Sequence, residues 1–243
     1  MSDANGILET DGYPRKRART RLLLLRAGLQ ALSSTGPDAL TVGQLTGLAG
    51  TSTGTFYNHF TCLADLVAEV AEHLGRGVEI ANDALESVEH DPAARVAIGT
   101  LQLLQLAEED PVASAAFVAL VGVLPDFRQR VRSIVRRAIE DGTRVGRFDV
   151  QPGEAPVNAV LGTSLQSMRS RVLGETTEDD QEAAVRLVLR MLGISAEEVP
   201  DVVVRARELV SAAPWRPFNP CGTLSVTSSR LPPAATPSRS IAT

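Results

Sequence analysis

The side chains in this sequence whose types and spacing suggest a specific chemistry lie between Thr51 and His59. Hydroxyl, amide, phenol and imidazole groups, all of which form hydrogen bonds, are concentrated there. Asparagine can pair with adenine, the threonine methyl group can contact the thymine methyl, and a tyrosine can lie against a phosphate. The pattern therefore indicates contacts with DNA, with a merely solvated polar surface as the alternative. The residues expected on the outer side of one short helix are Thr53, Thr55, Asn58 and His59.

Two short helical patterns would position these side chains. The first opens at Thr41 and has Gln44 three residues later, which is a capping-box arrangement. The second opens at Thr51–Thr53, whose hydroxyl groups can accept hydrogen bonds from the free N–H groups of a helix. Two short helices joined by a tight turn with glycine predict a helix-turn-helix whose second helix is exposed. We expect a small core beneath it, made of Val42, Leu45, Leu48, Ala49, Phe56 and Phe60.

A longer and strongly basic helical segment precedes this pair. Four leucines recur with helical spacing between Lys16 and Thr35, at positions 22, 25, 29 and 32. The net charge of −5 argues against a wholly basic nucleic-acid binder, but six cations fall within twelve residues. Between Tyr13 and Leu66 only two carboxylates oppose them. A segregated basic end on an acidic chain is typical of a modular DNA binder. The six cations are Arg15, Lys16, Arg17, Arg19, Arg21 and Arg26.

The rest of the sequence predicts an all-α protein with about nine or ten helices. Apolar residues recur with helical spacing, and proline or glycine separates the segments. The β-branched run Val202–Val204 follows Pro200 and Asp201, which together mark a helix start, so we expect no strand there. The expected domains are a disordered arm at 1–14, a helix-turn-helix domain at 15–62, a helical domain at 63–210 and a disordered tail at 211–243.

The segment from Arg19 to Leu66 resembles the DNA-binding domain of the TetR (tetracycline-repressor-like) transcriptional regulators. Its ending, Gly-x-x-Tyr-x-His-Phe from Gly54 to Phe60, is much more specific than a bare helix-turn-helix. The residues that carry the resemblance are Gly36, Thr41, Val42, Leu45, Ala49, Gly50, Ser52, Gly54, Tyr57, His59, Phe60 and Leu66. Together with the basic cluster, the resemblance implies DNA contacts by Arg15, Lys16, Arg17, Thr41, Ser52, Thr53, Gly54, Thr55, Tyr57, Asn58 and His59.

The sequence also departs from the family pattern. Thr46 and Gly28 stand where alanine is common, and Leu63 stands where a lysine often helps to hold a phosphate. No lysine or arginine occurs from Thr41 to Leu66. Phosphate contacts would therefore come from hydroxyl groups, Tyr57, His59 and backbone N–H groups, with the cations supplied by the segment 15–21.

The resemblance further implies an effector-binding and dimerisation domain after Leu63. The apolar stretch Val112–Leu124, with Leu101–Leu106 and Val160–Met168, could enclose an apolar pocket, although any single residue could equally belong to a filled core. The ligand contacts expected there are Leu101, Gln102, Gln105, Phe117, Val121, Leu165 and Met168, with Gln166 and Arg169 as further polar candidates. In the family the last body helices pair with their copies, and Ala155–Gly162 and Ala183–Leu192 have suitable small and apolar residues.

The leading hypothesis is a cytoplasmic homodimeric repressor that binds double-stranded DNA at an approximately palindromic operator and is released by an unknown small molecule. The alternative is a helical ligand-binding protein whose DNA binding is weakened or lost. An enzyme is disfavoured because no catalytic set occurs, and no cofactor, metal site or membrane partner is expected. Cys62, near the start of a helix, leaves open a redox role. There is no signal peptide pattern near the N-terminus.

Overall fold

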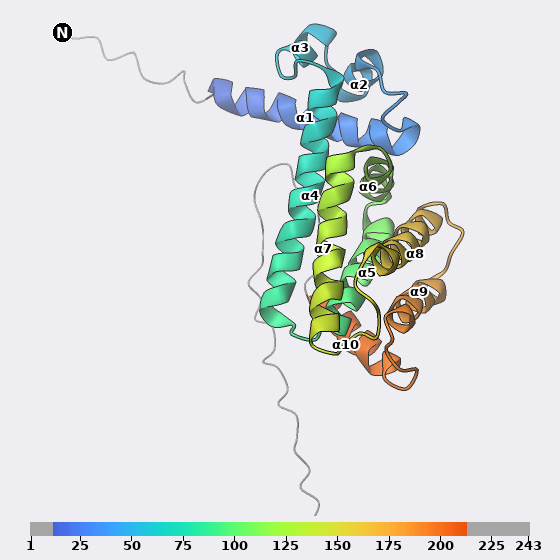
Figure 1. Cartoon of the computed structure of the whole chain (residues 1–243). Helices are drawn as coiled ribbons and strands as arrows, with labels where there is room; N and C mark the ends of the chain where they lie inside the picture. The colour runs from blue at the N-terminus through green and yellow to red at the C-terminus, as the bar shows by residue number, and fades with distance from the viewer. Residues whose placement is uncertain (1–11, 213–243) are drawn as a thin grey trace, which may run out of the picture.

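The computed structural model describes residues 12–212 and contains, within that range, ten α-helices and no β-strand (Figure 1). The expected all-α class is therefore confirmed. Three N-terminal helices form a head at one end of the molecule, and seven helices form a larger body below it.

The head is built from α1 (Gly12–Thr35), α2 (Val42–Ala49) and α3 (Thr53–Tyr57). Helices of eight and five residues are too short to be stable alone, so both depend on α1 and on the start of α4 for their buried side. Their shared core holds Leu24, Leu25, Leu29, Leu32, Leu45, Phe56, Phe60 and Leu66, all of which are almost fully buried.

Two sequence-based expectations about the head need correction. α1 begins at Gly12, so residues 12–14 belong to a helix and not to an arm; Pro14 is tolerated because it lies in the first turn, where backbone N–H groups have no partner within the helix. Leu48 is 49% exposed and does not join the core, because it lies at the surface beside Ser34 and Thr35 at the end of α1. The remaining parts of the expected arm and tail, 1–11 and 213–243, lie outside the described residues.

The body helices begin at strong local signals. α5, α6 and α7 each begin with a proline, and the side chains of Asp91 and Asp110 cap α5 and α6. The seven body helices are α4 (Leu63–Val88), α5 (Pro92–Glu109), α6 (Pro111–Val123), α7 (Pro125–Arg144), α8 (Glu154–Val172), α9 (Glu178–Met191) and α10 (Val199–Ala212).

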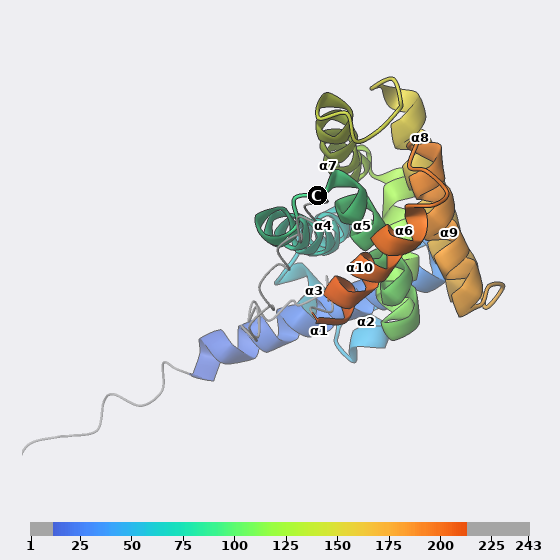
Figure 2. The same cartoon turned by 90° about the horizontal axis from the view of Figure 1, so that it is seen from below.

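The long helix α4 connects the head to the body. It descends beside α7, while α8 and α9 lie side by side on the opposite flank, and α10 crosses beneath α5 (Figures 1 and 2). Arg130 of α7 lies against Gly75 of α4 and forms ion pairs with Glu72 at 2.8 Å and Glu79 at 3.1 Å. The head and the body share one continuous apolar core, in which α1 packs on α6.

α6 is the most apolar element of the core. Ala113, Ala116, Phe117 and Leu120 are fully buried, and the Phe117 ring meets the Phe127 ring edge to face at 5.2 Å. Among residues 12–212 no single helix is long and apolar enough to cross a membrane; only α6 and α7 taken together reach that length and composition, and they are bent by 102°.

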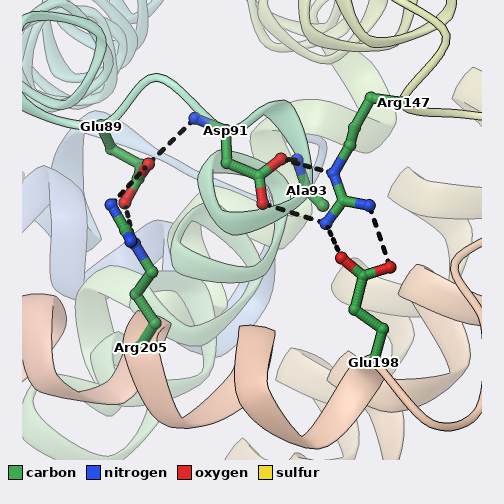
Figure 3. Close-up of polar contacts among 6 residues, drawn as sticks. All are labelled: Glu89, Asp91, Ala93, Arg147, Glu198 and Arg205. Carbon is green, nitrogen blue, oxygen red and sulfur yellow. Dashed lines mark hydrogen bonds and ion pairs between the residues drawn. The ribbon is translucent and has the colours of Figure 1, made fainter. Parts of the chain in front are cut away.

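An ionic network around the buried Glu89 lies at the far end of α4 (Figure 3). Glu89, the residue that ends α4, is 1% exposed and accepts hydrogen bonds from Arg205 at 2.6 and 3.2 Å. Arg147 donates two hydrogen bonds to Asp91, at 2.7 and 3.0 Å, and also pairs with Glu198. Burial alone would raise the pKa of Asp91, but the hydrogen bonds from Arg147 and the Ala93 N–H outweigh it and leave that pKa below its usual value.

Candidate nucleic-acid interface and ligand cavity

The turn between α2 and α3 is set by local hydrogen bonds. The Thr41 side chain accepts from Gln44 N–H at 3.2 Å, and Gln44 Oε1 accepts from Thr41 N–H at 3.0 Å, so the expected capping box is present. Gly50 ends α2 with φ of 62°, a left-handed conformation that glycine adopts without steric cost. Thr51 N–H then donates to Thr46 C=O at 2.9 Å, and the chain turns into α3.

α3 presents polar side chains over a buried aromatic anchor. Ser52 caps it by accepting from Thr55 N–H at 3.1 Å. Phe56 is fully buried and stacks on the Phe60 ring at 5.7 Å, so this ring fixes the rotation of α3 about its axis. The outer side, exposed to solvent, carries Ser52, Thr53, Gly54, Tyr57 and Asn58, with Thr55 and His59 partly exposed. The structure thus brings the sequence-predicted residues of the recognition helix onto one surface.

Arg21 has a structural role that its place in the basic cluster did not reveal. Its guanidinium donates to Glu69 of α4 with Nε at 2.9 Å and again through a second nitrogen, and to the His59 carbonyl at 2.8 Å. The same group lies 4.4 Å from the centre of the Phe60 ring. Arg21 therefore ties α1 to α4 and to the end of the motif, and its charge is already paired.

His59 lies partly buried between α3 and α4, beside α1. Burial, and then the nearby charges of Arg17 and Arg21, lower its pKa below 6.5, so the imidazole is neutral near pH 7. Its Nδ1 atom is buried and accepts no hydrogen bond within the described part of the chain. His59 thus supplies no positive charge to this surface near pH 7. Because the charge of Arg17 helps to lower the pKa of His59, Arg17 lies close to the helix-turn-helix.

The exposed cations near the head lie on α1. Lys16, Arg17 and Arg19 are exposed, and this end of α1 extends beyond α2 and α3 (Figure 1). The side chain of Arg15 lies outside the described residues. Because Arg21 is paired with Glu69, the exposed cations that remain within the described part of this cluster are Lys16, Arg17, Arg19 and Arg26.

The first turn of α4 carries a carboxylate, Asp65, two residues after Leu63, which stands where the family often places a lysine. Asp65 lies in the first turn and accepts a hydrogen bond from Thr61 N–H at 3.1 Å. Cys62 occupies the cap position without a side-chain hydrogen bond, and its thiol is free and exposed. The helix end therefore already has an anionic partner, and a phosphate approaching it would meet the charge of Asp65. The sequence showed both the missing lysine and this carboxylate, but not that the carboxylate accepts a hydrogen bond at the helix end.

The body contains a mainly apolar cavity of about 100 Å³ between α4, α5, α7 and α8, with Phe117 of α6 on its wall. α4 contributes Val78, Ala81 and Leu85, so the helix that leads to the head forms one side of the cavity. Polar groups are few, and the most buried of them are Arg95, Thr100 and Ser164.

Two of the seven sequence-predicted ligand residues, Gln102 and Phe117, lie on the cavity wall. The other five do not line it: Leu101, Gln105, Val121, Leu165 and Met168. Met168 is fully buried in the core, and Gln105 donates instead to Glu109 at 2.6 Å. Gln166 and Arg169 are exposed outside it. Sequence reasoning missed Arg95, because an arginine in a helix resembles a solvated residue until its environment is known.

The exposed positions of α8 and α9 include several small or apolar residues. Ala155 and Gly162 face outward on α8, and Ala183 and Leu187 face outward on α9, where Leu187 is 52% exposed. Small residues allow two helices to approach closely, and an exposed leucine favours burial against a partner.

Within residues 12–212, no group of three or more histidine, cysteine, aspartate or glutamate side chains is placed to hold a metal ion.

Comparisons with known proteins place both parts of the chain in one family. The model for bacterial regulatory proteins of the tetR family matches residues 24–70. The model for the tetracyclin repressor-like C-terminal domain matches residues 91–205. No curated protein matches the sequence.

Several solved structures share the fold at low sequence identity. A TetR-family transcription regulator from Marinobacter aquaeolei VT8 aligns with a TM-score of 0.62 and 17% identity, over 74% of this chain and 98% of that chain. A gamma-butyrolactone receptor (ArpA-like protein) aligns with a TM-score of 0.61 and 17% identity, over 82% and 99%. RolR in complex with resorcinol aligns with a TM-score of 0.52 and 24% identity, over 79% and 96%.

Proposed function

Because the chain belongs to the TetR family of DNA-binding transcription regulators, we propose that it is a homodimeric repressor that leaves its operator when a small molecule enters the body cavity. Regulators of this family are generally not enzymes, and a protein with this role works in the cytoplasm, where the DNA is. The observation that carries the proposal is that α4 both supports the helix-turn-helix and forms one wall of the cavity.

DNA recognition would rest on the exposed side of α3. Thr53, Thr55 and Asn58 have the side chains that contact bases in the major groove, and Tyr57, 57% exposed, can donate to a phosphate. The α1 cations would add contacts that do not depend on the sequence of the DNA. Two heads related by a two-fold axis would read an approximately palindromic operator.

Dimerisation would use the outer side of α8 and α9. Leu187→Arg would place a charge in that interface and should shift the protein toward monomer in analytical ultracentrifugation, while Val145→Arg, at an exposed valine just after α7, should leave the dimer intact. A Leu187→Arg protein that remains dimeric at the same concentration would contradict this assignment.

Release of DNA by an effector would follow because α4 both forms a wall of the cavity and supports the head. A molecule larger than the cavity would displace α4, and the head moves with α4 because Arg21 joins α1 to Glu69. The effector and the DNA would then favour different positions of α4, and each would weaken the binding of the other by the same factor.

The test is a gel-shift titration with the promoter region beside the gene for this protein. We expect sequence-selective and salt-sensitive retention, and Tyr57→Ala should weaken it about tenfold or more, since one hydrogen bond to phosphate is lost in each protomer. Val145→Ala, which removes an exposed apolar side chain just after α7, is the control. Absence of selective retention, or equal retention by Tyr57→Ala, would refute the proposal.

A second candidate function is a ligand-binding protein whose head no longer binds DNA tightly. The specific observation in its favour is Asp65, whose carboxylate occupies the helix end that could otherwise hold a phosphate. The two candidates differ in the slope of log affinity against log salt concentration, since few phosphate contacts give a shallow slope. An Asp65→Asn variant that gains operator affinity would show that this carboxylate limits DNA binding.

A further inference from the structure

Arg95 in the cavity wall has its charge balanced but its hydrogen bonds unmade. Glu86 lies 3.8 Å from one of its terminal nitrogens and Asp141 lies 3.9 Å from the other, distances that satisfy electrostatics but are too long for hydrogen bonds. The Arg95 side chain is only 15% exposed, and its Nε–H is buried without an acceptor in the described part of the chain. A buried donor without a partner costs free energy that an incoming acceptor would recover.

The carboxylates beside Arg95 decide which acceptor fits. Glu86 also accepts a hydrogen bond from Asn82 at 3.0 Å and stays on the cavity wall. A ligand carboxylate at Arg95 would be a third negative charge around one guanidinium, beside a glutamate it would partly desolvate. A neutral oxygen, such as a ketone, lactone or phenol oxygen, would accept from Nε–H without that repulsion.

The other residues of the cavity wall are apolar and favour a ligand that is itself mainly apolar. Val96, Phe117, Val131, Val135, Val160 and Leu161 surround the cavity. The Ser164 hydroxyl lies 3.4 Å from that of Thr100, which itself donates to the Val96 carbonyl at 3.0 Å. Ser164 is thus a second polar point at which a ligand hydroxyl or carbonyl could bind.

We infer that this cavity binds a small, uncharged and mainly apolar molecule that presents an oxygen acceptor to the Nε–H of Arg95. The inference rests on the proposed function in taking this cavity as the effector site, and it specifies the chemistry of the effector. The cavity is of the same order as the cavity of about 150 Å³ that holds one benzene ring in another helical protein, so one ring or a short chain sets the scale.

Gly99 offers a way to close the cavity without disturbing its walls. It lies on the wall in the middle of α5, and a Cβ atom added there meets nothing within 4 Å, so it would project into open space. Gly99→Val should fill part of the cavity, and the gain in helix propensity over glycine supports the fold. Because this variant should stay folded, its loss of ligand binding can be attributed to the filled cavity and not to misfolding.

The experiment is calorimetric titration of the DNA-free protein with four one-ring probes: acetophenone, toluene, benzoate and benzylamine. Acetophenone should bind about tenfold or more tightly than the other three, which corresponds to one hydrogen bond to a charged donor. Arg95→Met should lower acetophenone affinity to that of toluene and leave toluene unchanged. Gly99→Val should remove binding of all four, with circular dichroism confirming that both variants are folded.

Three outcomes would overturn the inference: tightest binding of benzoate, equal affinities of acetophenone and toluene, or no acetophenone binding by the wild-type protein. Operator binding is measured separately by gel shift, so either result leaves the proposed DNA function independently testable.

Discussion

Replacing Arg17 by alanine should weaken DNA binding to all sequences alike and make it less sensitive to salt. Arg17 is exposed, lies on the end of α1 that extends past the motif, and is close enough to His59 to lower its pKa. Each phosphate contact contributes about 0.9 to the slope of log affinity against log salt, so its loss from both protomers should reduce the slope by about 2. Between 200 and 50 mM salt the affinity difference from wild type should grow by about tenfold.

The assay is fluorescence anisotropy with a labelled operator and a scrambled duplex at four salt concentrations. Arg144→Ala is the matched control, since it removes an arginine, 71% exposed, from the far end of the body. An unchanged slope for Arg17→Ala, or an equal fall for Arg144→Ala, would show that the α1 cations do not contact phosphate. A loss confined to the operator would instead assign Arg17 to base recognition.

Three further predictions concern the head itself. Arg21→Gln should destabilise the protein by about 2 kcal/mol in urea unfolding, because it breaks the contacts with Glu69, the His59 carbonyl and the Phe60 ring, whereas Arg19→Gln should change it by less than about 0.5 kcal/mol. Gly28→Ala should cost about 1 kcal/mol despite better helix propensity, since the new Cβ would lie 2.5 Å from Leu66, and adding Leu66→Val should recover part of this loss. The folded-state pKa of His59 is below 6.5, so its contribution to stability is full above that pH and is lost as the pH falls through the folded value; the free energy of unfolding should decline from pH 7 to 5, and His59→Gln should flatten that decline.

Local signals in the sequence predicted local structure well. The Thr41 and Gln44 capping box depends on residues three apart and is present, and the polar residues from Ser52 to His59 share one surface. Spacing alone could not show the partner of a long side chain. Arg21 belongs to a basic run in the sequence, but its acceptor, Glu69, is 48 residues away.

The residues that line the cavity were even harder to predict from their spacing in the sequence. Leu101 and Met168 satisfy an apolar helical pattern, but such a pattern is identical for a filled core and for a cavity wall, and both residues pack into the core. Arg95 carries the distinctive chemistry only because Glu86 and Asp141, from two other helices, come near it without bonding to it. That arrangement depends on tertiary packing, which periodicity does not encode.

The hydrogen bonds between Arg205 and Glu89 anchor one end of α4, so a tilt of the helix would displace its other end most. Arg205 holds the last turn of this 26-residue helix, while the head sits at its other end. At 1.5 Å per residue, Val78 in the cavity wall lies about 15 Å from this anchored end and Leu63 lies about 38 Å from it. If α4 swings as a rigid rod, a displacement of about 1 Å at Val78 becomes about 2.5 Å at the head. In the proposed mechanism, the anchored end thus determines how far a displacement of α4 at the cavity is amplified at the head.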